Sequence, residues 1–312
     1  MNTHAFHRAL RTTLACLALG GLTFGAATQP KEGRITVVVA VIDIEPIVKA
    51  VGGGQVDTTS LFKGCILRSD LKVESTAKAS LAVAEAIVWT GFLNESAPIS
   101  TVLRIAGASA RKGGEPKWID VSKGTARTNL PTSTCSGYVD PAFASGDPFF
   151  WLNPENGGII ARNIARGLGE LRPASRALFM ANAESFQKTL AKDIERWKGT
   201  LKPLHGLRVF TSQCGWQNFA SMGGPQFVVC KGTPGELPTP QALLTHIRDM
   251  KTDFILVDPN TPPEYAEAFR EHSHLKVFLV PSSIETIRGA ATYSALFDNL
   301  VKVLQSQPRR EP

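Results

Sequence analysis

The chain has no apolar segment as long as the roughly 17–25 residues that a membrane-spanning helix needs. A shorter apolar run, residues 14–22, follows two arginines and precedes the small residues Gly25-Ala26-Ala27. This order is typical of a secretory signal peptide with its cleavage site after the small residues. We therefore expect residues 1–27 to be a signal peptide that is cleaved after Ala27, and the mature protein to be soluble and exported.

The sequence also lacks a concentration of charge of one sign. Its formal net charge of +7 falls to about +5 without the signal peptide, which holds arginines but no acidic residue. The remaining basic residues are scattered among acidic ones. They form no Lys/Arg run, no zinc-finger spacing and no alternation with aromatic residues. We therefore expect no nucleic-acid partner.

Catalytic motifs are absent as well. The chain has no phosphate-binding glycine loop, no serine nucleophile elbow and no His-Glu-x-x-His helix. The run Gln213-Cys214-Gly215-Trp216 is similar to the nucleophile segment of cysteine proteases. The downstream His and Asn partners that such a site needs are missing, however. We therefore do not expect an enzyme.

Short β-branched runs alternate with stretches of helical periodicity, such as residues 76–85. This alternation predicts parallel sheets whose ligand crevice lies at the carboxyl ends of the strands. About 285 mature residues suit two domains, so we expect an α/β fold with two doubly wound parallel-sheet lobes. The expected strands are Ile35–Val41, Val56–Phe62, Ala86–Trp89 and residues 101–105 in the first lobe, and residues 207–211, Gln226–Val229, Phe254–Val257 and residues 276–280 in the second.

One long amphipathic helix separates the two sets of strands. From Ser175 to Leu201 apolar residues recur at helical spacing between charged faces. The preceding Leu171-Arg172-Pro173 is typical of a helix end followed by a new start. The predicted boundaries are residues 28–172 for the first lobe, 173–201 for the linking helix, 202–304 for the second lobe and 305–312 for a disordered tail.

The octapeptide Asp147-Pro148-Phe149-Phe150-Trp151-Leu152-Asn153-Pro154 resembles the signature Asp-Pro-His-x-Trp-Leu-Asp-Pro of the zinc/manganese-type solute-binding proteins of bacterial ABC importers. The helix after it and the segment Gly235-Glu236-Leu237-Pro238 follow in that family's order, so the resemblance covers roughly residues 35–304. It implies two lobes joined by a rigid helix, with a ligand cleft between them. It also implies a periplasmic location and delivery of the solute to an inner-membrane ABC permease.

The resemblance further implies four metal ligands, and this sequence replaces all of them. The family's three ligand histidines correspond to Ser69, Phe149 and Gln213, and its acidic ligand corresponds to Val280. Zinc prefers imidazole, thiolate or carboxylate donors. We therefore expect no ordinary zinc site at these positions.

The substitutions suggest a cleft that is partly aromatic. Phe149 in one lobe and Trp216 in the other would suit a small organic ligand or a metal chelate held by stacking. In the alternative interpretation, the neighbouring Phe150 and Trp151 are core residues. The polar residues expected to line the cleft are Ser69, Asp70, Gln213 and Arg288.

The chain has five cysteines, and an even number remains after cleavage, as is typical of an oxidising compartment. Cys214 follows one predicted strand of the second lobe and Cys230 ends the next. Both are therefore expected at the carboxyl edge of neighbouring strands, where the geometry suits a disulfide. Cys65 and Cys135 are left as a pair in the first lobe, and their pairing stays open.

We therefore expect a monomeric, exported solute-binding protein with no resident cofactor, which captures a ligand between its lobes for an ABC permease. The expected ligand is a metal complex or a small organic molecule. Two alternatives remain open. One is direct binding of Zn²⁺ or Mn²⁺ through other donors, such as Asp70 and Cys214. The other is a structural or adhesive role without a ligand.

Overall fold

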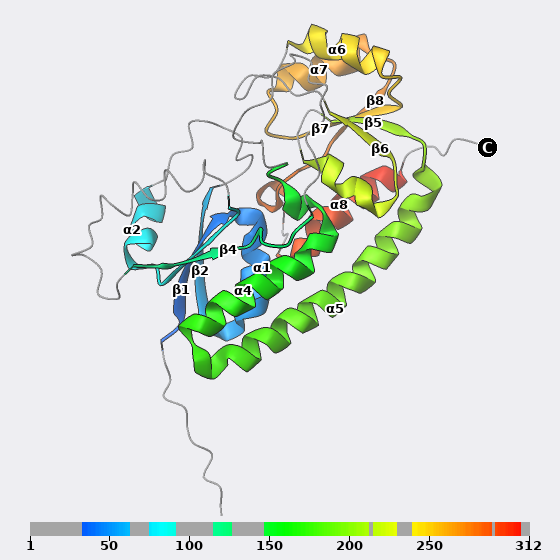
Figure 1. Ribbon diagram of the computed structural model, residues 1–312. Coiled ribbons are helices and arrows are strands. Elements are labelled where there is room, and N and C mark those ends of the chain that lie inside the picture. Colours follow the sequence, from blue (N-terminus) through cyan, green and yellow to red (C-terminus); the bar gives the residue numbers. More distant parts are fainter. Residues whose placement is uncertain are drawn as a thin grey trace, which may run out of the picture. The chain divides into compact units, whose positions relative to one another are not determined.

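The structure is a computed structural model that describes residues 33–62, 75–91, 115–126, 147–211, 215–229, 239–288 and 291–306. Within these ranges the chain forms two four-stranded parallel sheets with helices packed around them (Figure 1). The predicted fold class, two parallel-sheet α/β lobes with one long helix, is confirmed. The signal peptide, the predicted strand at residues 101–105 and all cysteines lie outside the described residues.

The first sheet has the strand order β2-β1-β3-β4. Its central strand β1 is almost entirely buried, because helices cover both faces of a parallel sheet. The fourth strand was not predicted: it reads Lys-Trp-Ile-Asp, and only Ile119 in it is buried. The strands are β1 (Ile35–Val41), β2 (Val56–Phe62), β3 (Ala86–Trp89) and β4 (Lys117–Asp120).

The helices of the first lobe are α1 (Glu45–Gly52), α2 (Ser75–Val83) and α4 (Gly157–Leu171). Helix α1 starts with a proline at its first turn, where the missing N–H costs no helical hydrogen bond. Its Glu45 carboxylate accepts hydrogen bonds from Thr58 Oγ1 and Ser60 Oγ, both at 2.6 Å. These bonds tie α1 to β2 and fix the chain just after β1.

The second sheet has the order β6-β5-β7-β8. Residues on its strands alternate between two cores, as the two-residue period of a strand requires. Phe210, Ile255 and Val257 pack with helices α6 and α7, whereas Val209 and Leu256 join the core of the first lobe. The elements are β5 (Arg208–Thr211), β6 (Gln226–Val229), β7 (Phe254–Val257), β8 (Lys276–Leu279), α6 (Pro240–Asp249) and α7 (Pro263–His272).

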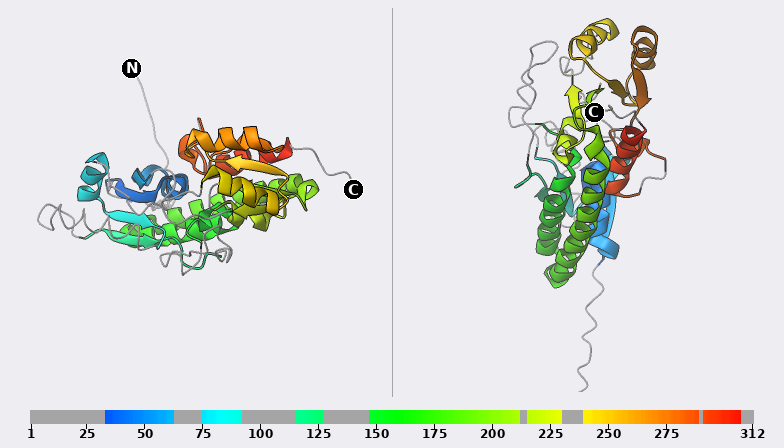
Figure 2. Two further views of the ribbon diagram at one scale, coloured as in Figure 1. Left: turned by 90° about the horizontal axis from the view of Figure 1, so that it is seen from above. Right: turned by 90° about the vertical axis from the view of Figure 1, so that its right-hand side faces the viewer.

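Helix α5 (Arg176–Leu201) has 26 residues and is therefore about 39 Å long. It packs along α1 and α4 of the first lobe and against α8 (Tyr293–Gln305) (Figure 2). The Trp197 Nε1–H donates to Asp298 Oδ1 of α8 at 2.8 Å. The side chains buried along α5, at spacings of four or seven, are Phe179, Ala183, Leu190, Trp197 and Leu201.

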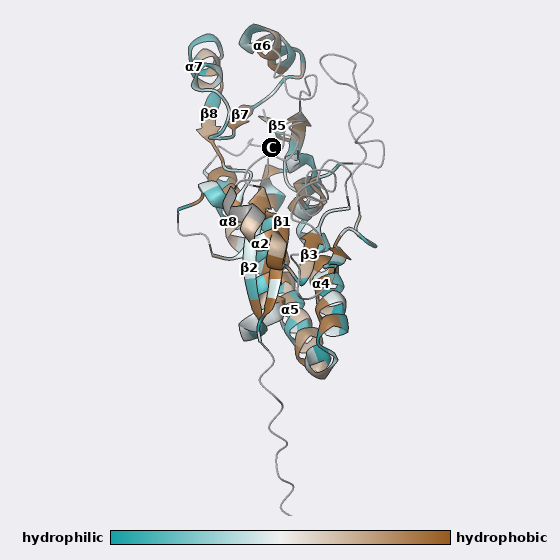
Figure 3. Cartoon of the chain, turned by 90° about the vertical axis from the view of Figure 1, so that its left-hand side faces the viewer, coloured by the Kyte–Doolittle hydropathy of each residue, from teal (hydrophilic) through white to brown (hydrophobic). Residues whose placement is uncertain are grey.

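One hydrophobic core runs through both lobes. It extends from β1, whose hydrophobic residues are visible in Figure 3, through α4, α5 and α8 to one face of the second sheet. The second sheet is therefore held to the rest of the protein by packed side chains as well as by the chain itself. None of the helices described is both long and apolar enough to span a membrane.

Candidate functional site

The signature turn begins at Asp147, a buried carboxylate that orders the residues after it. Asp147 Oδ1 accepts the backbone N–H of Phe149 at 2.9 Å, which closes the turn. Its other oxygen accepts a hydrogen bond from Gln217 Nε2, a side chain of the second lobe. The acid of the signature therefore shapes the turn and also joins the two lobes.

Asn153 has the same double role at the other end of the signature. Its Oδ1 accepts the N–H of Glu155 at 3.0 Å and so caps the following 3₁₀ turn. The same atom accepts the Ser221 hydroxyl at 3.0 Å. Ser221 and Gln217 both belong to the 3₁₀ helix Trp216–Met222 of the second lobe. Both ends of the signature thus contact one element across the lobes.

Phe149, which the sequence resemblance predicts at a ligand position, is only 5% exposed. Its ring meets that of Trp151 edge-on, with centroids 5.3 Å apart. Gly215 of the second lobe, whose φ of +111° favours glycine, lies against it. A Cβ at Gly215 would be 2.9 Å from Phe149 Cβ and 2.7 Å from Leu152 Cδ1. The second lobe therefore covers Phe149 at close range.

The other predicted cleft residues are partly described. Trp216 is buried and packs edge-on against Phe219 at 6.3 Å. Val280 is also buried. Its N–H donates to Val257 O at 2.9 Å and so continues the hydrogen bonding between β7 and β8 by one residue. Arg288 is exposed. The predicted residues Ser69, Asp70, Gln213 and Cys214 lie outside the described residues, as do Cys65, Cys135 and Cys230.

Sequence reasoning missed Asp43, which is 2% exposed just after β1. Its Oδ1 accepts the Ser283 hydroxyl at 2.9 Å and the Ile284 N–H at 2.8 Å. Both donors come from the second lobe. The available signal was a lone acid in an apolar run at the carboxyl end of a parallel strand, where crevices form.

Burial raises the pKa of Asp43 from 3.8 to about 6. The hydrogen bonds from Ile284 and Ser283 oppose that rise, as does the nearby Trp151 indole, although no hydrogen bond of ordinary geometry forms to Trp151 Nε1. The negative charge of Asp258 adds to the rise. The effect of burial on the pKa of Asp43 is thus larger than the opposing effect of the hydrogen-bond donors around it.

Asp258 is the second buried carboxylate of this region and follows β7. Its Oδ2 accepts the backbone N–H of Ser282 at 2.8 Å and the Ser282 hydroxyl at 2.6 Å. Its Oδ1 accepts the N–H of Asn260 at 2.8 Å. All these donors belong to the second lobe, so Asp258 orders that lobe internally.

Tyr293, at the start of α8, completes the cluster. Its hydroxyl donates to the backbone carbonyl of Trp151 in the signature turn. Burial, and to a lesser degree the charge of Asp43, raise its pKa well above the ordinary tyrosine value. The phenol therefore remains protonated and serves as a neutral donor between the second lobe and the signature.

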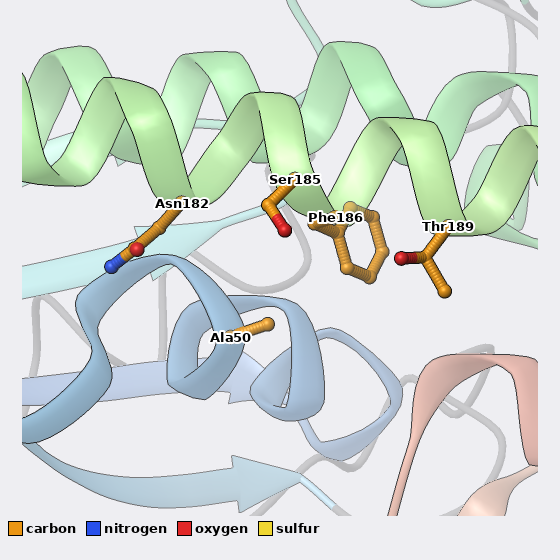
Figure 4. A pocket seen from close by; sticks show the side chains of 5 residues that line it. All are labelled: Ala50, Asn182, Ser185, Phe186 and Thr189. Atoms are coloured by element: carbon orange, nitrogen blue, oxygen red, sulfur yellow. The ribbon is translucent and has the colours of Figure 1, made fainter.

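Within the described part of the chain, no three His, Cys, Asp or Glu side chains gather as metal ligands. A separate pocket of about 260 Å³ lies between α1 and α5, lined by Ala50, Asn182, Ser185, Phe186 and Thr189 (Figure 4). It is shallow and smaller than the roughly 300–1,000 Å³ of typical small-molecule sites.

Comparison with known proteins agrees with the fold. The manganese ABC transporter substrate-binding lipoprotein PsaA of Streptococcus pneumoniae is 26% identical over 172 residues, which are 51% of this chain and 54% of PsaA. The high-affinity zinc uptake system protein ZnuA of Brucella abortus is 25% identical over 165 residues, 51% of this chain and 49% of that protein. The matched part thus spans about half the length of these curated relatives.

Solved structures share the architecture over most of the chain. A crystal structure of ZnuA superposes with a TM-score of 0.69 at 20% identity, covering 88% of this chain and 97% of that one. The model of the family described as "ZnuA: Zinc-uptake complex component A periplasmic" matches residues 37–307. The chain therefore belongs to the ZnuA family of periplasmic zinc-uptake components.

Proposed function

We propose that this protein is an exported solute-binding protein that captures a ligand between its two lobes and delivers it to an ABC importer permease of the inner membrane. Family membership and the two-lobed fold support this role. The relative PsaA is by name the substrate-binding component of an ABC transporter. The protein acts as a monomer in the periplasm after cleavage behind Ala27, and it binds its ligand without catalysing a reaction.

The ligand is a metal complex or a small organic molecule rather than a bare zinc or manganese ion. The main support for this proposal is Phe149, whose side chain is buried against Gly215 of the second lobe and which the sequence resemblance aligns with a ligand histidine. A phenyl ring supplies no electron pair to a divalent cation. Ser69, Gln213 and Val280, at the other ligand positions, are equally poor donors for zinc.

Isothermal titration of the metal-stripped mature protein with Zn²⁺ and Mn²⁺ tests this proposal. We expect no stoichiometric site of nanomolar affinity, because the free energy of metal binding comes largely from the side chains that coordinate the ion directly. A parallel thermal-shift screen of metal chelates and periplasmic metabolites should identify a compound that raises the melting temperature. Failure of every chelate and metabolite would instead favour a structural role.

A nanomolar zinc site would contradict the proposal and favour the alternative of unusual donors. Asp70→Ala and Cys214→Ala should then abolish that site. His272→Ala is the matched control, because His272 is exposed at the end of α7 and its nearest ionic partner is Glu271 at 3.8 Å. If His272→Ala alone removed zinc binding, the bound metal would lie on the surface, outside the cleft.

We also propose that Cys214 and Cys230 form a disulfide at the edge of the second sheet. The register of β5 and β6 supports this pairing, because Thr211 lies opposite Val229 in adjacent parallel strands. Cys214 and Cys230 follow these two residues closely in the sequence. Cys65 and Cys135 form the second, less constrained pair.

A further inference from the structure

Asp43 links the two lobes through one carboxylate oxygen. Its Oδ1 receives the Ser283 hydroxyl at 2.9 Å and the Ile284 N–H at 2.8 Å, from residues that lie 240 and 241 positions further along the chain. The Asp43 side chain is buried, and its neighbours in the sequence are apolar. This contact therefore exists only while the lobes are together at this point.

The segment that meets Asp43 is held independently by the second lobe. Asp258 binds the backbone and hydroxyl of Ser282, immediately before Ser283. Breaking the Asp43 contacts would therefore leave Ser282–Ser283 attached to the second lobe, and the two lobes would part between Asp43 and Ser283. Asp43 is therefore the first-lobe partner in a contact that can open without disrupting the second lobe.

The groups that face Asp43 leave its charge poorly compensated. They are the neutral donors of Ser283 and Ile284, the Trp151 indole, the protonated Tyr293 phenol and the negative carboxylate of Asp258. Burial and Asp258 together raise the pKa of Asp43 to about 6. A protonated carboxyl can carry its hydrogen on Oδ2 and still accept both hydrogen bonds at Oδ1.

We propose that joining the lobes at Asp43 takes up a proton from solvent, so that mildly acidic medium favours the joined form and neutral medium favours separation at this contact. Asp43 is thus a positioning residue for lobe closure. This inference rests on the proposed function, in which separation of the lobes exchanges the ligand.

The direction follows from linkage between proton binding and lobe contact. When the contact opens, water reaches Asp43 and its pKa returns toward the ordinary value of 3.8. Between about pH 4 and pH 6 the joined form therefore binds more protons than the open form, and a falling pH favours the joined form. A pKa of 3.8 in the open form and of about 6 in the joined form corresponds to a roughly hundredfold change in the opening equilibrium.

Hydrogen exchange of the ligand-free mature protein tests the inference through the peptide that spans residues 282–287. Protection factors, corrected for intrinsic exchange rates, should rise between pH 7 and pH 4.5 by a factor of about 10 to 100 in the wild type. Asp43→Asn keeps an acceptor oxygen but cannot titrate, so its protection should stay constant. Asp120→Asn is the matched control, because Asp120 binds Ser122 within the first lobe only.

An unchanged protection factor in the wild type would overturn the inference, and so would a pH response in Asp43→Asn equal to that of the wild type. If Asp43→Asn does not fold, Asp43→Ser supplies a second variant that can accept a hydrogen bond but cannot titrate. Its protection should also stay constant with pH, and a pH response equal to that of the wild type would contradict the inference. The hydrogen-exchange experiment uses ligand-free protein, so its outcome does not depend on whether the ligand screen finds a compound. A negative hydrogen-exchange result would likewise leave the proposed function unaffected.

Discussion

Phe149 of the signature turn packs closely against Gly215 of the second lobe. The positive φ of Gly215 and the 2.9 Å that would separate its missing Cβ from Phe149 require a glycine there. The Phe149 ring is therefore accommodated by a residue that has no side chain of its own.

Phe149→Ala should destabilise the fold by about 3–5 kcal/mol, because it leaves a cavity between Trp151 and Gly215 that neither lobe can fill. Equilibrium unfolding in urea measures the change. The control is Leu178→Ala on α5, whose side chain is 47% exposed and should change stability by no more than about 0.5 kcal/mol. A loss of stability below about 1 kcal/mol, accompanied by loss of ligand binding, would identify Phe149 as a cleft wall instead.

Single residues were predicted unevenly from the sequence. The signature turn was recognised because its residues are contiguous and follow a known pattern. Asp43 was missed because its partners Ser283 and Ile284 are remote in sequence, so no local pattern connects them. Whether an acid after a strand faces solvent or a second lobe depends on the tertiary fold.

Among the elements, helices α4, α5 and α8 meet at one glycine. A Cβ at Gly157, the first residue of α4, would be 2.5 Å from Leu190 Cδ2 of α5 and 2.9 Å from Tyr293 Cε1 of α8. The absence of a side chain at Gly157 lets the long helix and the last helix pack against the start of α4. This contact places Tyr293 within reach of the Trp151 carbonyl.

Gly157→Ala should therefore destabilise the protein by about 1–3 kcal/mol through overpacking. Gly199→Ala is the matched control within α5, because a Cβ there would meet nothing within 4 Å. That substitution should stabilise the protein by about 0.5–1 kcal/mol, since alanine favours a helix interior over glycine. Thermal and urea unfolding of both variants measure the contrast, and equal effects of the same sign would refute the packing argument.

Elements with strong periodicity were predicted nearly to the residue. Strands β1, β2, β3, β6 and β7 have the expected bounds, because β-branched, aromatic and other apolar residues predominate in each of them. Strand β4 escaped prediction because its lysine and aspartate interrupt the apolar pattern at a sheet edge. Strand β4 forms because it pairs in parallel with β3, from Ala86 opposite Lys117 to Trp89 opposite Asp120. Its own composition does not favour a strand.

At the scale of the whole molecule, the lobes are joined by a shared core and by a small set of polar contacts. The core continues from β1 through α5 and α8 to the second sheet. Polar contacts of Asp43, Asp147, Asn153 and Tyr293 lie where the carboxyl end of β1 and the signature turn meet the second lobe. Large hinge motion would break that core, whereas a limited separation at the polar contacts would not.

The second lobe has a small separate core beneath α6 and α7, and a covalent link would reinforce the lobe at the edge of β5 and β6. Closing the loop between Cys214 and Cys230 should stabilise the mature protein by about 3 kcal/mol in the chain-entropy model.

Peptide mapping of periplasmic material without reduction should recover the linked peptides. Cys214→Ser should lower the unfolding free energy about as much as a reducing agent lowers it in the wild type. Cys65→Ser measures the first-lobe pair separately, and alkylation of both Cys214 and Cys230 in unreduced native protein would rule out the link.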